Sequence, residues 1–160
     1  MQKTLIFLAF LFALPVTLSA QMLQRPEPEE KPRMVVFVVG IKNEQVSDYL
    51  TNLIGNNLSQ THTIIPRTEA VKKKIQELKE YEDAGHVDDW QLIEWGRQYN
   101  VSVLCLVTAA YADEYIFSAQ LTDVKTNTLI GNSEYEIPTL SGDNLKKAAA
   151  ALASQLTRRR

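Results

Sequence analysis

Residues 101–109 read VSVLCLVTA and form the most apolar segment that follows the first twenty residues. Several of its side chains are β-branched, which favours a strand. Because the run is apolar without alternation, it is typical of a strand buried on both faces, and we expect it at the centre of a sheet. Residues 34–39, MVVFVV, have the same character and end at Gly40. They predict a second buried strand.

Two alternating segments follow the expected central strand. Residues 115–124 place Tyr115, Phe117, Ala119 and Leu121 on one face and Ser118, Gln120 and Thr122 on the other. Residues 129–137 alternate in a similar way. Residues 123–128 between the two segments predict a hairpin turn, because Asn127 tolerates the left-handed conformation and Asp123 can bond to the turn backbone.

Helical spacing of apolar residues marks much of the remaining chain. It predicts helices over 44–58, 68–82 and 142–157, and a further helix that begins at Asp88 or Asp89 and carries Leu92, Ile93, Gly96 and Tyr99. Gly85 is the expected end of the second helix, and residues 62–65 predict a short strand. The order β-α-β-α-α-β-β-β-α indicates an α/β fold, a mixed sheet of about five strands flanked by helices. The early strands are expected to run parallel, and the last three are expected to form an antiparallel meander.

The 160-residue chain has the composition of a globular protein. Hydrophobic residues make up 45% and charged residues 22%, which excludes an intrinsically disordered chain. The single cysteine excludes an intramolecular disulfide framework and a multi-cysteine metal site. The formal net charge is -2, so the chain lacks the basic surface typical of nucleic-acid-binding proteins. We therefore expect no nucleic-acid partner.

The first twenty residues have the three parts of a secretory signal peptide. Lys3 gives a positive start, an apolar run extends from Leu5 to Leu14, and the small residues Ser19 and Ala20 precede the expected cut. The run is shorter than the about 20 apolar residues that span a bilayer, so a retained membrane anchor is the less favoured alternative. Cleavage after Ala20, or after Ser19, would leave a periplasmic protein without a transmembrane segment. No cysteine lies near the cut, so we do not expect a lipoprotein.

Residues 21–33, QMLQRPEPEEKPR, form the next segment. Its three prolines and mixed charges predict a short, stiff, extended linker. A single folded domain is then expected over residues 34–160.

Groups that could carry a reaction are few. Cys105 lies within the most hydrophobic strand, where burial disfavours a reactive thiolate, so we interpret it as a core residue. His86 lies among acidic residues, but the spacing matches no metal-binding loop. Glu82 and Asp83 are adjacent carboxylates at an expected helix end, which is a weak basis for acid–base catalysis. Because no phosphate-binding glycine loop occurs either, we expect no catalytic site, no cofactor and no metal.

Residues expected at the surface are better candidates for a functional site, because they could bind another protein. Trp90 stands at the start of the expected third helix and can serve as a partly exposed anchor, whereas Trp95 can pack inward beside Tyr99. Exposed tryptophans are enriched in protein interfaces, and core packing is the alternative for Trp90. We single out Trp90 and Arg97 as candidate protein-binding residues. The lysines at 72–74 are interpreted as part of a solvated helix face.

The hairpin segment 115–128 resembles a motif of a periplasmic α/β family. Its residues Gln120-Leu121-Thr122-Asp123-Val124-Lys125-Thr126-Asn127 are similar to the family's "arginine or glutamine, Leu, x, Asp-Val-x-Thr-Gly" hairpin. Upstream, Ile65-Pro66-Arg67-Thr68 resembles the family's short second strand, and residues 85–101 resemble its third helix and the entry to its central strand. The family includes the amino-terminal domain of TolB, the curli-secretion protein CsgG and the penicillin-binding-protein activator LpoB. The resemblance extends over residues 34–156 in element order.

This resemblance implies an envelope-located binding or accessory module without catalytic residues. It implies another cell-envelope protein as partner, such as a peptidoglycan synthase or a component of outer-membrane assembly. The chain departs from the family at Asn127, which stands where the family has glycine. The lipidation cysteine of the CsgG-like and LpoB-like lipoproteins is missing, and no long alternating insertion could build a secretion pore.

Three functions follow as hypotheses. The leading one is a non-enzymatic periplasmic adaptor that offers a helix face or a sheet edge to another envelope protein. The alternative is a periplasmic small-ligand-binding protein, with a pocket on the sheet face that bears Tyr115 and Phe117, although such alternating faces normally pack against helices. The third and weakest is a hydrolase that would use Glu82 and Asp83.

Overall fold

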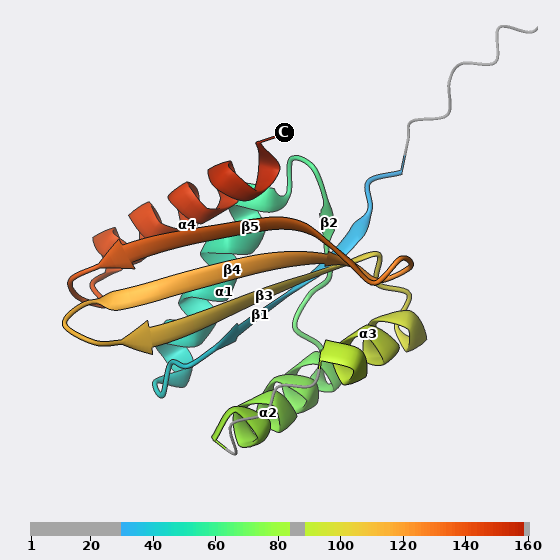
Figure 1. Cartoon of the computed structure of the whole chain (residues 1–160), viewed down its shortest axis with the longest axis horizontal. Helices are drawn as coiled ribbons and strands as arrows, with labels where there is room; N and C mark the ends of the chain where they lie inside the picture. The colour runs from blue at the N-terminus through green and yellow to red at the C-terminus, as the bar shows by residue number, and fades with distance from the viewer. Residues whose placement is uncertain (1–29, 84–88, 159–160) are drawn as a thin grey trace, which may run out of the picture.

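A five-stranded mixed sheet forms the centre of the computed structural model, which describes residues 30–83 and 89–158 (Figure 1). Within these ranges side chains are described except at positions 78, 79, 81–83 and 89. The strand order is β2-β1-β3-β4-β5, with the apolar run that contains Cys105 in the central strand. The fold class, the central position of this strand and the order β-α-β-α-α-β-β-β-α predicted from the sequence are confirmed.

The sheet has a parallel part and an antiparallel part. β1 (Arg33–Val39) runs parallel to the two-residue β2 (Thr63–Ile64) and to β3 (Val103–Tyr111). β4 (Tyr115–Asp123) and β5 (Thr128–Ile137) continue the sheet as an antiparallel meander. Because parallel neighbours need a long crossover, helices connect β1 to β2 and β2 to β3.

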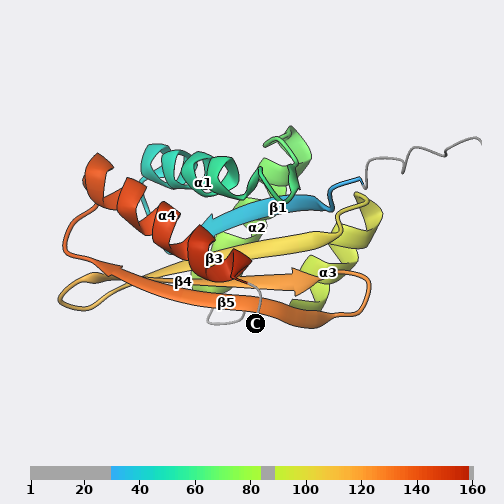
Figure 2. The same cartoon turned by 90° about the horizontal axis from the view of Figure 1, so that it is seen from above.

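α1 (Glu44–Leu58) and α4 (Gly142–Thr157) cover one face of the sheet, and Figure 2 shows them on the same side. Each helix begins at a side-chain cap: Asn43 accepts a hydrogen bond from the backbone N–H of Val46, and Ser141 accepts one from that of Asn144. The core beneath these helices draws side chains from β1, β3, β4 and β5, among them Met34, Val36, Val38, Cys105, Val107, Phe117, Ala119, Leu121 and Ile137.

α2 (Glu69–Asp83) and α3 (Asp89–Gln98) pack on the other face, against β1 and β3. This second core combines Val35, Phe37, Val39 and Leu104 of the strands with Val71, Ile75, Leu92, Ile93 and Trp95 of the helices. No described residue of β4 or β5 belongs to it. The two faces of the sheet are therefore covered unequally.

The helix boundaries follow the sequence prediction closely. The helices predicted over 44–58 and 142–157 are confirmed at both ends. β3 ends two residues beyond the predicted 101–109, because its last two residues pair with β4 across the hairpin although their side chains are exposed. The apolar residues of a sequence therefore indicate which part of a strand is buried, whereas the length of the strand is determined by the backbone pairing with its neighbour.

Two side chains differ from the sequence prediction. Lys74 is only 8% exposed instead of solvated, and its Nζ lies 3.2 Å from Glu77 Oε2. Tyr99 lies beyond the end of α3 and is 47% exposed. The expected helix end at Gly85 lies outside the described residues. Over the described part of the chain, no helix has both the length and the apolarity that crossing a bilayer requires.

Candidate docking surface

Among the described residues, the second core contains no side chain of β4 or β5, and we call the α3-side surface of these two strands the open face. Alternate residues of a strand point to opposite faces, and Phe117, Ala119 and Leu121 of β4 point into the core under α1 and α4. The residues between them point the other way, and the β4–β5 register places β5 side chains beside them. The open face consists of Ile116, Ser118, Gln120, Thr122, Leu129, Asn132, Glu134 and Glu136.

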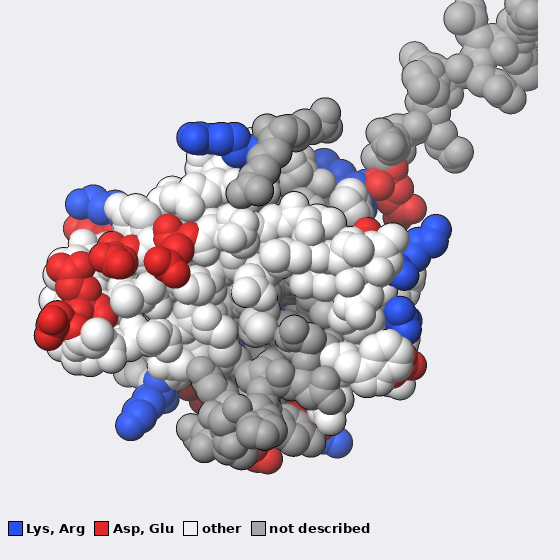
Figure 3. Space-filling model, in the orientation of Figure 1, with Lys and Arg blue, Asp and Glu red and all other residues white. Residues whose placement is uncertain are grey.

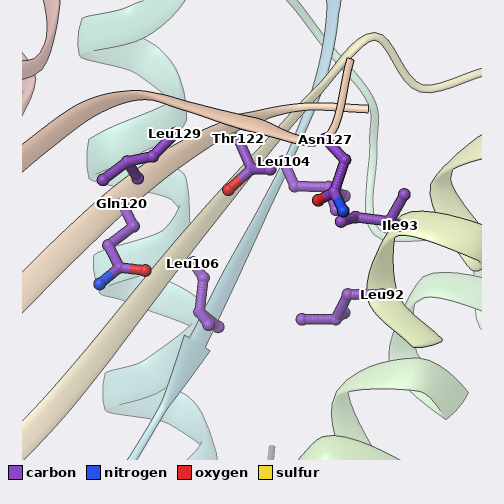
Figure 4. Close-up of a pocket in the computed structure, with 8 residues that line it drawn as sticks. All are labelled: Leu92, Ile93, Leu104, Leu106, Gln120, Thr122, Asn127 and Leu129. Carbon is purple, nitrogen blue, oxygen red and sulfur yellow. The ribbon is translucent and has the colours of Figure 1, made fainter. Parts of the chain in front are cut away.

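A groove of about 220 Å³ lies between α3 and the open face, and we call it the α3 groove (Figure 4). Leu92 and Ile93 of α3 face Leu104 and Leu106 of β3 across it, and Leu129 of β5 closes one side. Leu129 is 57% exposed, so a large apolar side chain of this groove remains in water. The polar groups of Gln120, Thr122 and Asn127 complete the lining. A mainly apolar cleft with a few polar groups is typical of a binding surface.

The β4–β5 turn fixes the rim of the α3 groove. Asp123 Oδ1 accepts hydrogen bonds from the backbone N–H of Thr126 at 2.8 Å and from its Oγ1 at 2.9 Å. The backbone hydrogen bond from Thr126 is the main cause that lowers the pKa of the Asp123 carboxyl below its usual value. Asn127 has a φ of 54° and lines the groove. The turn chemistry predicted from the sequence is confirmed at both Asp123 and Asn127.

The two candidate binding residues lie together on the outer surface of α3. Trp90 is 56% exposed, and the guanidinium carbon of Arg97 lies 5.5 Å from the centroid of its ring. Arg97 Nη1 also lies 3.5 Å from Glu94 Oε2. Positions 90, 94 and 97 share one helix face, so these contacts follow from helical spacing. The cation–π contact restrains a large aromatic ring at the surface, which reduces the entropy it would lose on binding a partner.

Aromatic packing fixes α3 on the sheet. The ring of Trp95 meets that of Phe37 edge to face at 5.4 Å and stacks on that of Tyr99 at 4.8 Å. A side chain at Gly96 would lie 3.1 Å from Val124, so glycine allows α3 to approach the sheet closely. The inward packing of Trp95 predicted from the sequence is confirmed. These contacts therefore hold α3 in a fixed position against the sheet, beside the α3 groove.

Charge is distributed unevenly along this side of the molecule. Glu134 and Glu136 are exposed at the end near the β3–β4 hairpin, and Figure 3 shows acidic side chains gathered at that end, at the left of the view. Ser118 Oγ donates a hydrogen bond of 3.0 Å to Glu134 Oε2. At the opposite end, Arg97 and Lys125 line a concavity of about 550 Å³. The open face between these ends carries neutral side chains.

The described groups with chemical reactivity do not converge on one site. Cys105 is fully buried in the first core, and burial raises the pKa of its thiol to about 12. The interpretation of Cys105 as a core residue is confirmed. His62, whose pKa is lowered by burial, lies at the end of α1 beside Thr61. The side chains of Glu82, Asp83 and His86 lie outside the described residues.

The Tyr115–Phe117 face of β4 packs against helices, which the sequence favoured over a ligand pocket on this face. Phe117 is fully buried in the core under α1 and α4, and Tyr115 packs against the same core. Helices α1 and α4 fill the space that a ligand would need. The expectation that the alternating aromatic face of β4 packs against helices is therefore confirmed.

Sequence reasoning missed the α3 groove, although one signal for it was present. Alternation placed Ser118, Gln120 and Thr122 on a common face of β4, and two of these line the groove. The pattern alone does not distinguish a polar face in water from one beside a helix. Leu129 was placed at the start of β5, but its exposure depends on which helices cover the sheet.

No protein-family model matches the chain, and no curated protein matches its sequence. Among solved structures, the fold is similar to TolB from Acinetobacter baumannii, with 12% identity over 76% of this chain and 26% of the TolB chain, at a TM-score of 0.49. It is similar to the LpoB C-terminal domain from Salmonella enterica, with 13% identity over 69% and 84% of the two chains, at a TM-score of 0.48. A PelC dodecamer from Paraburkholderia phytofirmans gives 15% identity over 82% and 90%, at a TM-score of 0.45. TolB and LpoB are also among the proteins of the family that the sequence resembles.

Proposed function

We propose that the protein is a non-enzymatic adaptor of the bacterial cell envelope that binds another envelope protein at the α3 groove and the outer surface of α3. The observation that carries this proposal is the exposed Trp90–Arg97 pair beside a groove whose apolar side chain Leu129 remains in water. Tryptophan and arginine are the residue types most enriched at interface hot spots. Trp95 and Gly96 hold the supporting helix against the sheet, so the surface is preformed.

The envelope location rests on the sequence. The signal-peptide pattern of residues 1–20 supports export to the periplasm. The resemblance of the hairpin segment to a periplasmic family supports the same location, and it favours a peptidoglycan synthase or a component of outer-membrane assembly as partner. The burial of Cys105 and the scatter of the other described reactive groups support a role without turnover.

Site-specific crosslinking in the intact envelope tests the adaptor role. A photoreactive residue in place of Gln91, which is exposed on α3 beside Trp90, should crosslink the same partner in repeated experiments. Trp90→Ala and Arg97→Ala should each reduce the affinity for this partner about thirtyfold, which corresponds to the loss of about 2 kcal/mol that marks a hot-spot residue.

Tyr49→Ala is the matched control, because Tyr49 is an exposed aromatic residue on α1, on the other side of the sheet. It should leave the crosslink unchanged. A crosslink that is equally strong in the Trp90→Ala, Arg97→Ala and Tyr49→Ala proteins would contradict the proposed site. If no specific partner is captured at position 91, the adaptor role itself is contradicted.

A small-ligand carrier remains the second candidate, and the polar groups of Gln120, Thr122 and Asn127 in the α3 groove favour it. The groove volume of about 220 Å³ is below that of a typical ligand pocket, which is at least about 300 Å³. A bound metabolite would raise the melting temperature of the protein by mass action. A thermal-shift screen of envelope metabolites should therefore give no stabilisation if the adaptor proposal is right.

A further inference from the structure

We infer that the open face receives an amphipathic helix of the partner protein, with apolar side chains in the α3 groove and basic side chains against Glu134 and Glu136. The inference rests on the proposed function and specifies the segment that the adaptor binds. Its basis is the geometry of the open face, the polarity of its side chains and the charge at its acidic end.

The dimensions of the open face fit one helix. β4 and β5 together are about 10 Å wide, which equals the diameter of a helix with its side chains. On the opposite face, the same two strands are covered by a single helix, α4, of 16 residues. β4 has nine residues and spans about 30 Å, so a helix of about 16 to 20 residues would cover the open face.

The polarity of the open face indicates a partner that binds reversibly. Under α4, β4 presents Phe117, Ala119 and Leu121, which are permanently buried. On the open face, the same strand presents Ser118, Gln120 and Thr122. Such side chains tolerate water when the surface is free and can donate or accept hydrogen bonds when it is covered. A mixed surface of this kind is typical of a non-obligate interface.

The acidic end of the open face determines which charge the partner's helix should carry. Glu134 and Glu136 are both exposed on the open face, which contains no lysine or arginine among its described residues. Leu129 pairs with Thr122 of β4, and Glu134 and Glu136 pair with Ser118 and Ile116, so the two carboxylates lie about 13 to 20 Å from Leu129 measured along β4. At 1.5 Å per residue, basic side chains should therefore follow the apolar anchor by about nine to thirteen helical residues.

Among the residues whose side chains the structure describes, no helix offers such an apolar stripe to a second copy of the chain. The apolar stripes of α1 and α4 pack in the first core and those described for α2 and α3 pack in the second, while the exposed aromatic residues Tyr49 and Trp90 are single side chains and form no stripe. Residues 21–33 contain three prolines and are poor helix formers. A helix from another protein is therefore the occupant that fits the open face.

Binding of designed peptides to the exported chain tests this inference. The probe is a labelled amphipathic peptide of about 18 residues with leucines along one stripe and three lysines near its C-terminal end. A second peptide has three glutamates in place of the lysines. Fluorescence anisotropy should show that the lysine peptide binds about tenfold more tightly, with a preference that weakens as salt rises from about 0.02 M to 0.15 M.

Substitutions in the open face test which of its residues cause the preference for the lysine peptide. Glu134→Gln combined with Glu136→Gln should remove the tenfold preference for the lysine peptide while leaving weak binding of both peptides. The matched control, Glu80→Gln combined with Asp143→Asn, removes the same charge from α2 and α4, and it should retain the preference. Leu129→Asp should weaken both peptides, because it places a carboxylate beside the apolar groove.

The outcomes separate this inference from the proposed function. Equal binding of the two peptides, or a preference that survives Glu134→Gln with Glu136→Gln, would overturn the inference of a basic helix. If the envelope crosslink at position 91 persists in that case, the adaptor role stands without it. Loss of the partner crosslink in the unaltered protein would overturn the adaptor role, whatever the peptides do.

Discussion

Gly40 ends β1 with a backbone conformation that other residues rarely adopt. Its φ is 82°, and a β-carbon at this position would collide with the carbonyl group of Ala109 in β3. The close approach lets β1 and β3 remain paired up to the last residue of β1, where Val39 lies opposite Thr108. Two independent constraints, the positive φ and the steric contact, therefore require glycine at this position.

Gly40→Ala should lower the free energy of unfolding by at least about 2 kcal/mol, because the backbone strain and the collision add. Gly142→Ala is the control: it lies in the first turn of α4, and a β-carbon there would meet nothing within 4 Å. That substitution should change stability by less than about 1 kcal/mol. Urea unfolding of both variants measures the difference, and equal stabilities would show that the β1–β3 junction relaxes freely.

The conformation or burial of a single residue could be predicted from the sequence where neighbouring residues of the chain determine it. Asn127 and Asp123 were identified from turn chemistry, and Cys105 was identified from its apolar neighbours. The prediction failed for Lys74, whose long side chain is buried beside Glu77 although lysine is normally solvated. The sequence also gave no sign of the Gly40 contact, since that contact depends on the register between two distant strands.

At the scale of elements, the β4–β5 hairpin depends on the charge of Asp123. The carboxylate accepts two hydrogen bonds from Thr126, and its pKa in the fold is lowered mainly by the backbone bond. The ionised form therefore favours the folded state. The stability it contributes is complete above the unfolded pKa of about 4 and is lost as the pH falls through the lower folded pKa.

Asp123→Ala should lower the free energy of unfolding by about 1 kcal/mol at neutral pH, because the turn loses both hydrogen bonds. Asp123→Asn should cost less, since its oxygen can still accept from Thr126. In both variants, the acid-induced loss of stability below about pH 4 should be smaller than in the unaltered protein. Urea unfolding at several pH values measures this. A wild-type pH profile in both variants would assign the acid sensitivity to other carboxyl groups.

The elements differ in how well a sequence predicts their ends. The limits of α1 and α4 were predicted to the residue, and each begins at a local cap, Asn43 or Ser141. The end of β3 lies two residues beyond the prediction, because pairing with β4 extends the strand into an exposed segment, and its start lies two residues later than predicted. Helix signals lie within the segment itself, whereas strand limits depend on neighbours that the sequence does not name.

At the scale of the whole molecule, the unequal cover of the sheet determines which surface is available for binding. Four helices were predicted, and two faces of a sheet were expected to carry them. The sequence could not show that α2 and α3 both pack against β1 and β3, in a core that includes no described residue of β4 or β5. The sequence could suggest Trp90 and Arg97 as candidates from their residue type and position, and their role in binding stays a prediction, whereas the α3 groove could be found only in the structure.

The central position of β3 makes Cys105 a probe of global unfolding. It is the single cysteine of the chain, its thiol is fully buried, and its pKa is raised to about 12 by burial. Alkylation requires a thiolate in water, so it can occur only when the sheet opens. The protection of Cys105 against iodoacetamide should therefore equal the equilibrium constant for global unfolding measured in urea.

An exposed cysteine on the same strand provides the control for this measurement. Ala110 lies in β3 with its side chain exposed, so the Ala110→Cys substitution in a Cys105→Ala background should give rapid alkylation without denaturant. The two positions share a strand and differ in burial, so the ratio of their rates isolates the opening of the core. If Cys105 reacts at a rate close to that of position 110, the central strand opens without global unfolding. Because β3 contributes side chains to both cores, such a local opening would disturb the packing on both faces of the sheet.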